Sequence, residues 1–216
     1  MTSNAHAPAQ HAPTVTSHWW WRPGWGPGRR GYAWHINVGL EPLHDHATAY
    51  QRAISHLPQL DLIPLEWLHL TVQGVGFVDE TSDEDVAAIV EATRRRLADV
   101  TPIRLTFDRP IQRPEALAIH PTPAEPLVEV RTMLRDAIAE VWGPDKVEGS
   151  ADGFQPHVSL AYVNAPGPSD EIVASIDQVT AEPVELVVDT VSLIELFRDG
   201  HLYRWDTVHK VTLGAT

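Results

Sequence analysis

A short histidine pattern occurs twice in this chain, and the repeat constrains the fold more than any other feature. The sequence reads HLTV at 69–72 and HVSL at 157–160, 88 positions later (69 to 157). Each copy is followed by a Ser-Asp-Glu sequence with matching apolar positions, SDEDVAAI at 82–89 and SDEIVASI at 169–176. Because Ser-Asp-Glu favours a helix start, each copy predicts a strand, a loop and a helix. A repeated unit of this kind predicts two similar lobes, each with one histidine strand.

The rest of the chain shows strand and helix patterns that follow the same plan. Alternating and β-branched stretches predict strands at 32–40, 67–74, 102–108, 116–120, 157–163, 184–197 and 201–213. Apolar spacing and cap signals predict helices at 45–57, 82–100, 124–142 and 169–179. The pair Asp199 and Gly200 predicts a tight hairpin between the last two strands. The predicted fold class is therefore α+β.

Strand geometry places the polar residues of each motif together. Alternate side chains of a strand share a face, so His69 lies beside Thr71, and His157 lies beside Ser159. One neutral imidazole can remove a proton from an attacking oxygen, and a protonated one can supply a proton to a leaving oxygen. Histidine can take both forms near neutral pH because its ordinary pKa is about 6.5. With hydroxyls to bond the non-bridging oxygens, this set suits a displacement at phosphorus that needs no metal.

The two motifs resemble the paired H-x-[ST]-x motifs of the 2H phosphoesterase superfamily, which includes 2'-5' RNA ligases and RNA 2',3'-cyclic phosphodiesterases. The likeness spans about residues 32–213. It implies a bilobal duplicated fold in which two antiparallel sheets line a central cleft, with helices on the outside and a pseudo-two-fold axis. It also implies metal-independent opening of 2',3'-cyclic phosphates to the 2'-phosphate, or formation of 2'-5' phosphodiesters. By this resemblance His69 and His157 are the acid and base, Thr71 and Ser159 hold the phosphate, and no cofactor takes part.

Further residues are candidates for contact with the substrate. Gln73 continues the cleft-facing series of the first motif strand, as Ala161 does in the second, and a solvated amide at a strand end is the alternative for Gln73. His35 lies on a strand expected beside the first motif. Arg198 and Tyr203 in the closing hairpin could neutralise phosphate or stack on a base. Surface or core positions remain open for all of these. Tyr162 has the phase of a core-facing residue.

The N-terminal region divides into two parts before the predicted single bilobal domain at 32–216. Residues 1–17 are Ala/Pro-rich, lack the features of a secretion signal and are expected to be a disordered tail. Residues 18–31, HWWWRPGWGPGRRG, form an arm with four Trp and three Arg, which gives a local charge of +3. The arm could supply a cation and a stacking surface to the substrate. Alternatively, its tryptophans cover a sheet edge or one end of the core.

Composition restricts the environment and the partners of the chain. It has no cysteine, so disulfides and thiolate nucleophiles are excluded. A net charge of −13 opposes binding to a long nucleic acid, so we expect a small nucleotide or an RNA end as substrate. No apolar run has the length of a membrane span. We expect a cytoplasmic monomer that makes no membrane contact.

Two other function classes compete with a phosphodiesterase. The same cleft could bind a nucleotide or RNA end without efficient turnover, although both histidines and both hydroxyls are retained. The 12 histidines could also indicate a metal enzyme. No HxxxH or HExxH pair lies on a predicted helix, and HDH at 44–46 has no further ligand at suitable spacing, so no metal is expected. A chelator separates the metal enzyme from the other two.

Overall fold

The computed structural model describes residues 10–38 and 41–214, and the duplication is plain in the order of its elements. The first half contains β2 (Arg30–Asn37), α1 (Glu41–Ile54), β4 (His69–Phe77), α2 (Asp83–Leu97) and β5 (Ile103–Phe107). The second half contains β7 (Ala116–Ile119), α3 (Glu125–Trp142), β8 (Val158–Val163), α4 (Asp170–Asp177) and β10 (Val184–Val188). Both halves thus run strand, helix, strand, helix, strand. The predicted duplicated α+β fold is confirmed.

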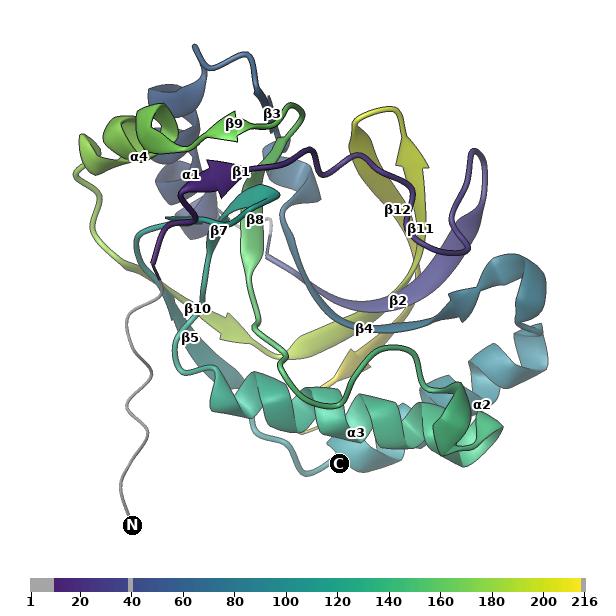
Figure 1. The fold of residues 1–216 in the computed structure, drawn as a ribbon. Coiled ribbons are helices and arrows are strands. Elements are labelled where there is room, and N and C mark those ends of the chain that lie inside the picture. The colour runs from purple at the N-terminus through teal and green to yellow at the C-terminus, as the bar shows by residue number, and fades with distance from the viewer. Residues whose placement is uncertain (1–9, 39–40, 215–216) are drawn as a thin grey trace.

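Two antiparallel sheets carry the two motif strands (Figure 1). The remaining strands are β1 (Thr14–Val15), β3 (Leu60–Leu62), β6 (Ile111–Gln112), β9 (Gly167–Pro168), β11 (Thr190–Asp199) and β12 (Leu202–Thr212). Within the described residues, one sheet has the order β12-β11-β2-β4 and the other the order β3-β8-β7-β6. Strands β5 and β10 pair with each other and join the two halves. The first motif strand therefore lies at the edge of its sheet, beside β2, and the second lies beside β7.

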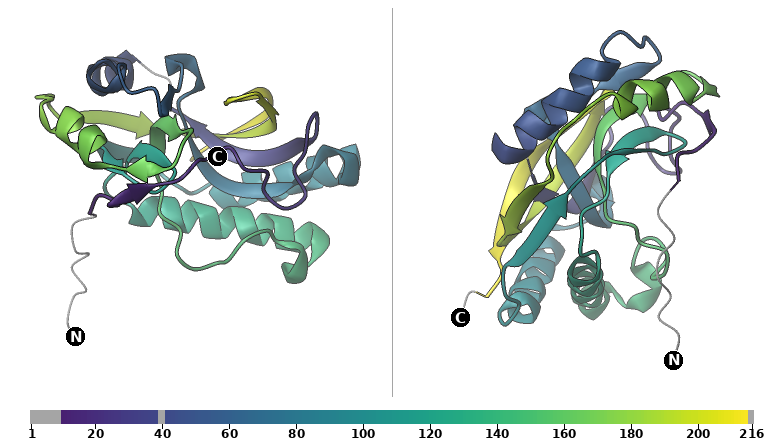
Figure 2. Two further views of the ribbon diagram at one scale, coloured as in Figure 1. Left: turned by 45° about the horizontal axis from the view of Figure 1, so that its top comes forward. Right: turned by 90° about the vertical axis from the view of Figure 1, so that its left-hand side faces the viewer.

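The helices cover the outer faces of the two sheets (Figure 2). Helices α2 and α3 pack together and contact the sheet that contains β4, whereas α1 and α4 pack together and α1 contacts β8. One continuous apolar core includes fully buried residues of both halves, such as Trp34, Phe107 and Leu134. This arrangement leaves the inner faces of the motif strands to form the cleft between the sheets.

The two sheets exchange strands between the halves. Strand β3 belongs to the first half of the chain but pairs with β8 of the second half. Strand β11 follows the second half but pairs with β2 of the first half. The single strand predicted at 184–197 is therefore two strands, β10 and β11, which belong to different sheets. The predicted hairpin after β11 is confirmed, with Gly200 at a φ of +59° between the paired residues Asp199 and Leu202.

The N-terminal tail differs from its prediction. Residues 1–9 lie outside the described residues, but residues 10–17 are ordered rather than disordered. Thr14 and Val15 form β1, which pairs with β9, and Val15 is 2% exposed. Ser169, the first residue of the second Ser-Asp-Glu repeat, donates its hydroxyl hydrogen to the carbonyl of Ala12 at 2.5 Å. The Ala/Pro-rich composition predicted disorder because it gives no sign of β9, the strand with which residues 14–15 pair.

Other element boundaries differ by a few residues. The strand predicted at 32–40 ends at Asn37, and residues 39–40 lie outside the described part of the chain. The helix predicted at 45–57 begins at Glu41 and ends at Ile54. In residues 10–38 and 41–214, no helix is both long and apolar enough to cross a membrane.

Candidate active site

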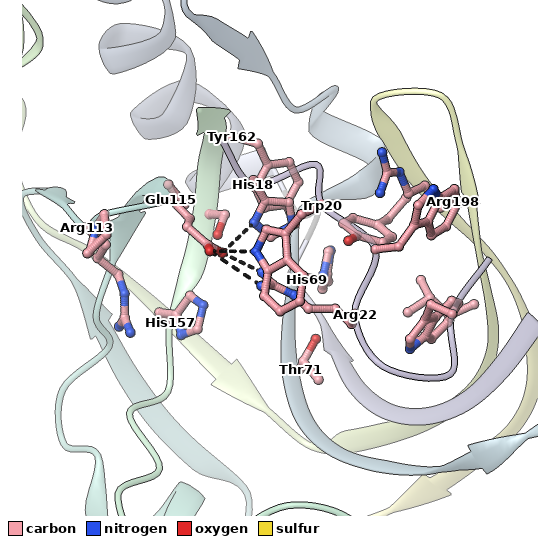
Figure 3. A pocket seen from close by; sticks show the side chains of 17 residues that line it. His18, Trp20, Arg22, His69, Thr71, Arg113, Glu115, His157, Tyr162 and Arg198 are labelled. Atoms are coloured by element: carbon pink, nitrogen blue, oxygen red, sulfur yellow. Dashed lines mark hydrogen bonds and ion pairs between the residues drawn. The ribbon is translucent and has the colours of Figure 1, made fainter. Parts of the chain in front are cut away.

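Both histidine motifs line one cavity of about 620 Å³ (Figure 3). His69 and Thr71 enter it from β4, and His157 and Ser159 enter it from the start of β8 and the loop before it. The sequence prediction that these four side chains meet around one groove therefore agrees with their placement. Arg198 and Tyr203 also line the cavity, whereas Gln73 and His35 do not.

The first motif strand contains a β-bulge directly after Thr71. Thr71 pairs with His35 and Gln73 pairs with Trp34, so Val72 has no partner on β2. His35 and Trp34 are consecutive and point to opposite faces, and directly opposed residues share a face. Gln73 therefore points away from Thr71 and is only 4% exposed. This corrects the prediction that Gln73 faces the cleft.

The second motif strand contains a bulge at the equivalent position, directly after Ser159. Ser159 pairs with Ala118 and Tyr162 pairs with Ala116, so β8 uses three steps where β7 uses two. Ala118 and Ala116 share a face, so Ser159 and Tyr162 do as well. Tyr162 lines the cavity although its strand phase predicted a core-facing position, and Ala161 is buried instead. Nothing in the sequence signalled either bulge.

The two imidazoles are held in the same way. The Nδ1 of His69 donates to the carbonyl of Trp67, and the Nδ1 of His157 donates to the carbonyl of Gln155, both at 2.8 Å. Because a carbonyl only accepts, each neutral ring carries its hydrogen on Nδ1. The lone pair of each ring is thus on Nε2. That is the atom that remains for proton transfer with a molecule in the cavity.

Burial favours the neutral form of both imidazoles. It lowers the pKa of His69 to about 4, against the opposing effect of the hydrogen bond to Trp67 and with a smaller lowering by His157. Burial also lowers the pKa of His157, where the bond to Gln155 opposes it and the charge of Arg113 adds to it. Both imidazoles are therefore mainly neutral at pH 7 in the ligand-free protein.

His35 lies against the first motif but beneath the cleft surface. It is fully buried, its ring stacks on His69 with centroids 4.5 Å apart, and its Nε2 is 3.0 Å from Oγ1 of Thr71. Burial and the nearby His69 hold its pKa well below the ordinary value, so it is neutral. Its Nδ1 has no partner among the described residues, so a hydrogen on Nε2 avoids an unbonded N–H. Thr71 then accepts from His35 and keeps its own hydroxyl hydrogen for the cleft.

The sequence analysis did not identify two residues that lie beside His157. Arg113, in the turn between β6 and β7, lines the cavity and has no carboxylate partner in the described part of the chain. It donates to Nε2 of His120 at 3.3 Å and to the side chain of Gln155 at 3.4 Å. His120 in turn donates its Nδ1 hydrogen to Pro156, and burial lowers its pKa to about 4, helped by Arg113 and His157. A lone Arg and a lone His in loops gave no signal in sequence.

The arm lies across the cavity and fits both interpretations of its sequence. Trp19 is 7% exposed and donates its indole hydrogen to Asp61 at 2.7 Å, so it closes one end of the core. His18, Trp20, Trp21, Arg22 and Trp25 line the cavity. The arm is thus part core and part cleft wall.

A carboxylate from the body of the protein fixes the arm. Glu115 accepts hydrogen bonds from the indole of Trp20 at 3.0 Å and from Arg22, and lies 3.4 Å from Nδ1 of His18 (Figure 3). Burial acts to raise the pKa of Glu115, but the hydrogen bonds from Arg22 and Trp20 outweigh it and keep the pKa below its ordinary value. Burial and the charge of Arg22 lower the pKa of His18 to about 4. Glu115 is therefore ionised and His18 neutral at pH 7.

The cavity is cationic although the chain is acidic. Its lining contains Arg22, Arg113 and Arg198 but the single carboxylate Glu115, which is already bonded to Arg22. Arg198 donates to the carbonyls of Trp19 and Gly200, at 2.8 and 2.9 Å, and has no carboxylate partner among the described residues. Arg113 and Arg198 can therefore attract a small anion. In residues 10–38 and 41–214, no three His, Asp or Glu side chains come together as ligands for a metal ion.

Comparisons with known proteins agree with this architecture. Residues 40–200 match the model of the 2'-5' RNA ligase superfamily, so the match covers more than half of the chain and excludes the arm. A search of curated proteins found no match.

Solved structures share the fold. They include TT0787 of Thermus thermophilus (TM-score 0.66, 20% identity, covering 86% of this chain and 98% of that one). They also include E. coli LigT complexed with 3'-AMP (TM-score 0.61, 19% identity, covering 86% and 98%). A protein of unknown function from Agrobacterium tumefaciens is similar too (TM-score 0.52, 17% identity, covering 83% and 85%). Given the duplicated fold, the paired motifs and the family match, the chain belongs to the 2'-5' RNA ligase superfamily of 2H phosphoesterases.

Proposed function

We propose that this protein is a metal-independent phosphodiesterase that opens 2',3'-cyclic phosphates of RNA ends or nucleotides to the 2'-phosphate. The same site would join RNA ends through a 2'-5' linkage when a 5'-hydroxyl takes the place of water as the nucleophile that opens the 2',3'-cyclic phosphate. One observation carries the proposal. Two imidazoles, each with Nδ1 bonded to a backbone carbonyl, present Nε2 to one cavity, and each stands beside a hydroxyl.

The reaction needs one base and one acid. A neutral imidazole takes a proton from water, the water oxygen attacks phosphorus, and the bond from phosphorus to the 3'-oxygen breaks. The protonated imidazole gives its proton to that 3'-oxygen, so the phosphate stays on the 2'-oxygen and the two histidines have exchanged protonation states. Thr71 and Ser159 donate hydrogen bonds to the non-bridging oxygens, where charge develops. Arg113 adds a cation on the His157 side.

The electrostatics of the cavity support binding of a small anion. In the free protein burial keeps both imidazoles mainly neutral, so the acid must gain its proton as the substrate binds. A phosphate anion between the rings raises their pKa values, because an opposite charge favours the charged form. The net charge of −13 repels a long polyanion outside the cationic cavity. This combination favours a mononucleotide or the end of an RNA.

Ligands of a structural relative agree with that substrate class. LigT of E. coli has been solved in complexes with 3'-AMP, ATP and NADP+. A protein of this fold can therefore bind a small nucleotide. These ligands support a small nucleotide as the class of substrate for this chain.

The test is a substrate panel in the presence of EDTA. It contains the four 2',3'-cyclic mononucleotides, RNA with a cyclic phosphate end, and 2'-5' dinucleotides, and the 2'- and 3'-monophosphate products are resolved. We expect hydrolysis to the 2'-phosphate in EDTA. Activity that EDTA abolishes and zinc restores would indicate a metal enzyme, and tight binding without turnover would indicate a binding module. Accumulation of 3'-phosphate would mean that the substrate lies in the opposite orientation.

A further inference from the structure

Two tryptophans of the arm line the cavity with much of their surface in contact with solvent. Trp20 is 49% exposed and Trp21 is 41% exposed. An indole that stays in water forgoes the stabilisation that burying so large an apolar side chain provides. Exposed aromatic surface at the wall of a cavity is typical of a ligand-binding surface. The family model match begins at residue 40, so this wall lies outside the part of the chain that the match covers.

Trp20 is held in place by bonds rather than by burial. Its Nε1 hydrogen bonds to Glu115 at 3.0 Å, and the guanidinium of Arg22 lies 4.0 Å from the ring centroid. Arg22 is itself bonded to Glu115, so the three side chains form a closed set, which we call the clasp. The clasp fixes the orientation of an indole that remains half exposed.

The clasp also limits what Arg22 can do. Its charge is balanced by Glu115, which is ionised, so Arg22 supports the indole more than it attracts an anion. Arg113 and Arg198, which lack carboxylate partners among the described residues, carry the uncompensated positive charge of the cavity. A ligand that contacts both the exposed indole and these guanidinium groups has a flat ring next to an anionic group. A nucleoside phosphate has both parts.

We propose that Trp20 is the stacking surface for the base attached to the reacting phosphodiester, and that Arg22 and Glu115 are its positioning residues. This inference rests on the proposed function, since the base is taken to belong to that substrate. Stacking on an indole face tolerates different bases, because every base has a π face. The interaction therefore selects nucleotides over ribose phosphates without strict choice among bases.

The first experiment compares two substrates with the same reacting group. One is adenosine 2',3'-cyclic phosphate, and the other is the 2',3'-cyclic phosphate of 1-O-methylribose, which has no base. We expect wild-type KM to be lower for the nucleotide by about tenfold to a hundredfold, the range that base stacking gives. Trp20→Leu should remove that difference, and Trp20→Phe should restore part of it. Equal KM values for the two substrates in wild type would overturn the proposal.

Two further variants test the clasp and the specificity of the effect. Glu115→Ala removes both bonds that fix the clasp and frees the charge of Arg22 for either anion, so the wild-type difference in KM between the nucleotide and the ribose phosphate should shrink. Arg29→Gln is the matched control, because Arg29 belongs to the arm but bonds to Asp79 and Glu80 and does not line the cavity. It should leave both KM values unchanged. A Glu115→Ala effect of equal size on both substrates would show that the clasp does not act through the base.

A binding measurement separates this inference from the hydrolysis on which it rests. Calorimetry with adenosine 2'-monophosphate and ribose 2-phosphate needs no turnover, and circular dichroism checks that each variant is folded. If no cyclic phosphate is hydrolysed but Trp20→Leu weakens binding of the nucleotide alone, the stacking surface stands and the hydrolysis fails. If hydrolysis proceeds and Trp20→Leu affects both ligands equally or neither, the stacking surface is wrong and the hydrolysis stands. Absence of turnover and of base-dependent binding overturns both.

Discussion

The two halves of the cleft share their geometry and differ in their electrostatics. Each motif has a bulge directly after its hydroxyl residue and an imidazole whose Nδ1 bonds to the carbonyl two residues earlier. Around His69, however, the surroundings are the stacked ring of His35 and the edge of Trp205, whereas His157 has the guanidinium of Arg113 nearby. The two halves therefore orient their imidazoles in the same way but surround them with different side chains. This difference suits the proposed mechanism, in which one imidazole acts as the base and the other as the acid.

The largest expected effect comes from removing either imidazole. His69→Ala and His157→Ala should each lower kcat by about a hundred- to ten-thousandfold, the usual contribution of a general acid or base, with the fold intact. Similar losses in both variants would show that the two halves matter equally. Steady-state kinetics on a 2',3'-cyclic nucleotide measure this, with the exposed His56→Ala as a control outside the cleft. Full activity in either variant would contradict the mechanism.

The hydroxyls should matter less than the imidazoles. Thr71→Val and Ser159→Ala each remove one hydrogen bond to phosphate, and we expect kcat to fall by about tenfold to a thousandfold. Thr71→Ser keeps the hydroxyl that His35 orients and should retain most of the activity. If Thr71→Ser were as impaired as Thr71→Val, the methyl group rather than the hydroxyl would be the part that matters.

Arg113→Gln sharpens the comparison because it changes one half alone. Loss of the cation should raise KM by about tenfold, the size of a charge-assisted hydrogen bond. Since Arg113 lowers the pKa of His157, its loss should raise that pKa and move the limb of the pH profile that His157 controls to higher pH. Arg104→Gln, an exposed residue of β5 paired with Glu185, is the control. An unchanged pH profile would show that Arg113 does not act on His157.

The smallest expected effect is a difference between the pH optimum of kcat/KM and that of kcat. The base must be neutral and the acid protonated, so kcat/KM should rise with pH through the lower pKa and fall through the higher one. Burial lowers the pKa of His69 to about 4 and lowers that of His157 from its ordinary value, so kcat/KM should peak at acidic pH, below the ordinary histidine pKa. Bound phosphate raises both, so kcat should peak at higher pH. The limbs describe the pair rather than single residues. A flat profile, or a kcat/KM optimum above pH 7, would contradict the assignment.

The sequence predicted what depends on local pattern and missed what depends on a partner strand. The histidine motifs, the Ser-Asp-Glu helix starts and the hairpin at Gly200 are local, and the structure has them. A β-bulge exists only relative to the neighbouring strand. Strand phase alone could therefore not predict that Gln73 points away from the cleft and that Tyr162 points into it. Arg113 reaches the cleft because the hairpin of β6 and β7 pairs with β8, the second motif strand. Its neighbours in sequence give no hint of that contact.

The exchange of β3 and β11 between the halves bears on the entropy of catalysis. Each four-stranded sheet contains a strand that the other half of the chain supplies, so the halves cannot separate without breaking ladder hydrogen bonds of β3 with β8, β11 with β2, and β5 with β10. The spacing of the two imidazoles is thus set when the chain folds. The loss of translational and rotational freedom needed to bring the two imidazoles together occurs once, during folding, and the proposed reaction does not require it again in each turnover.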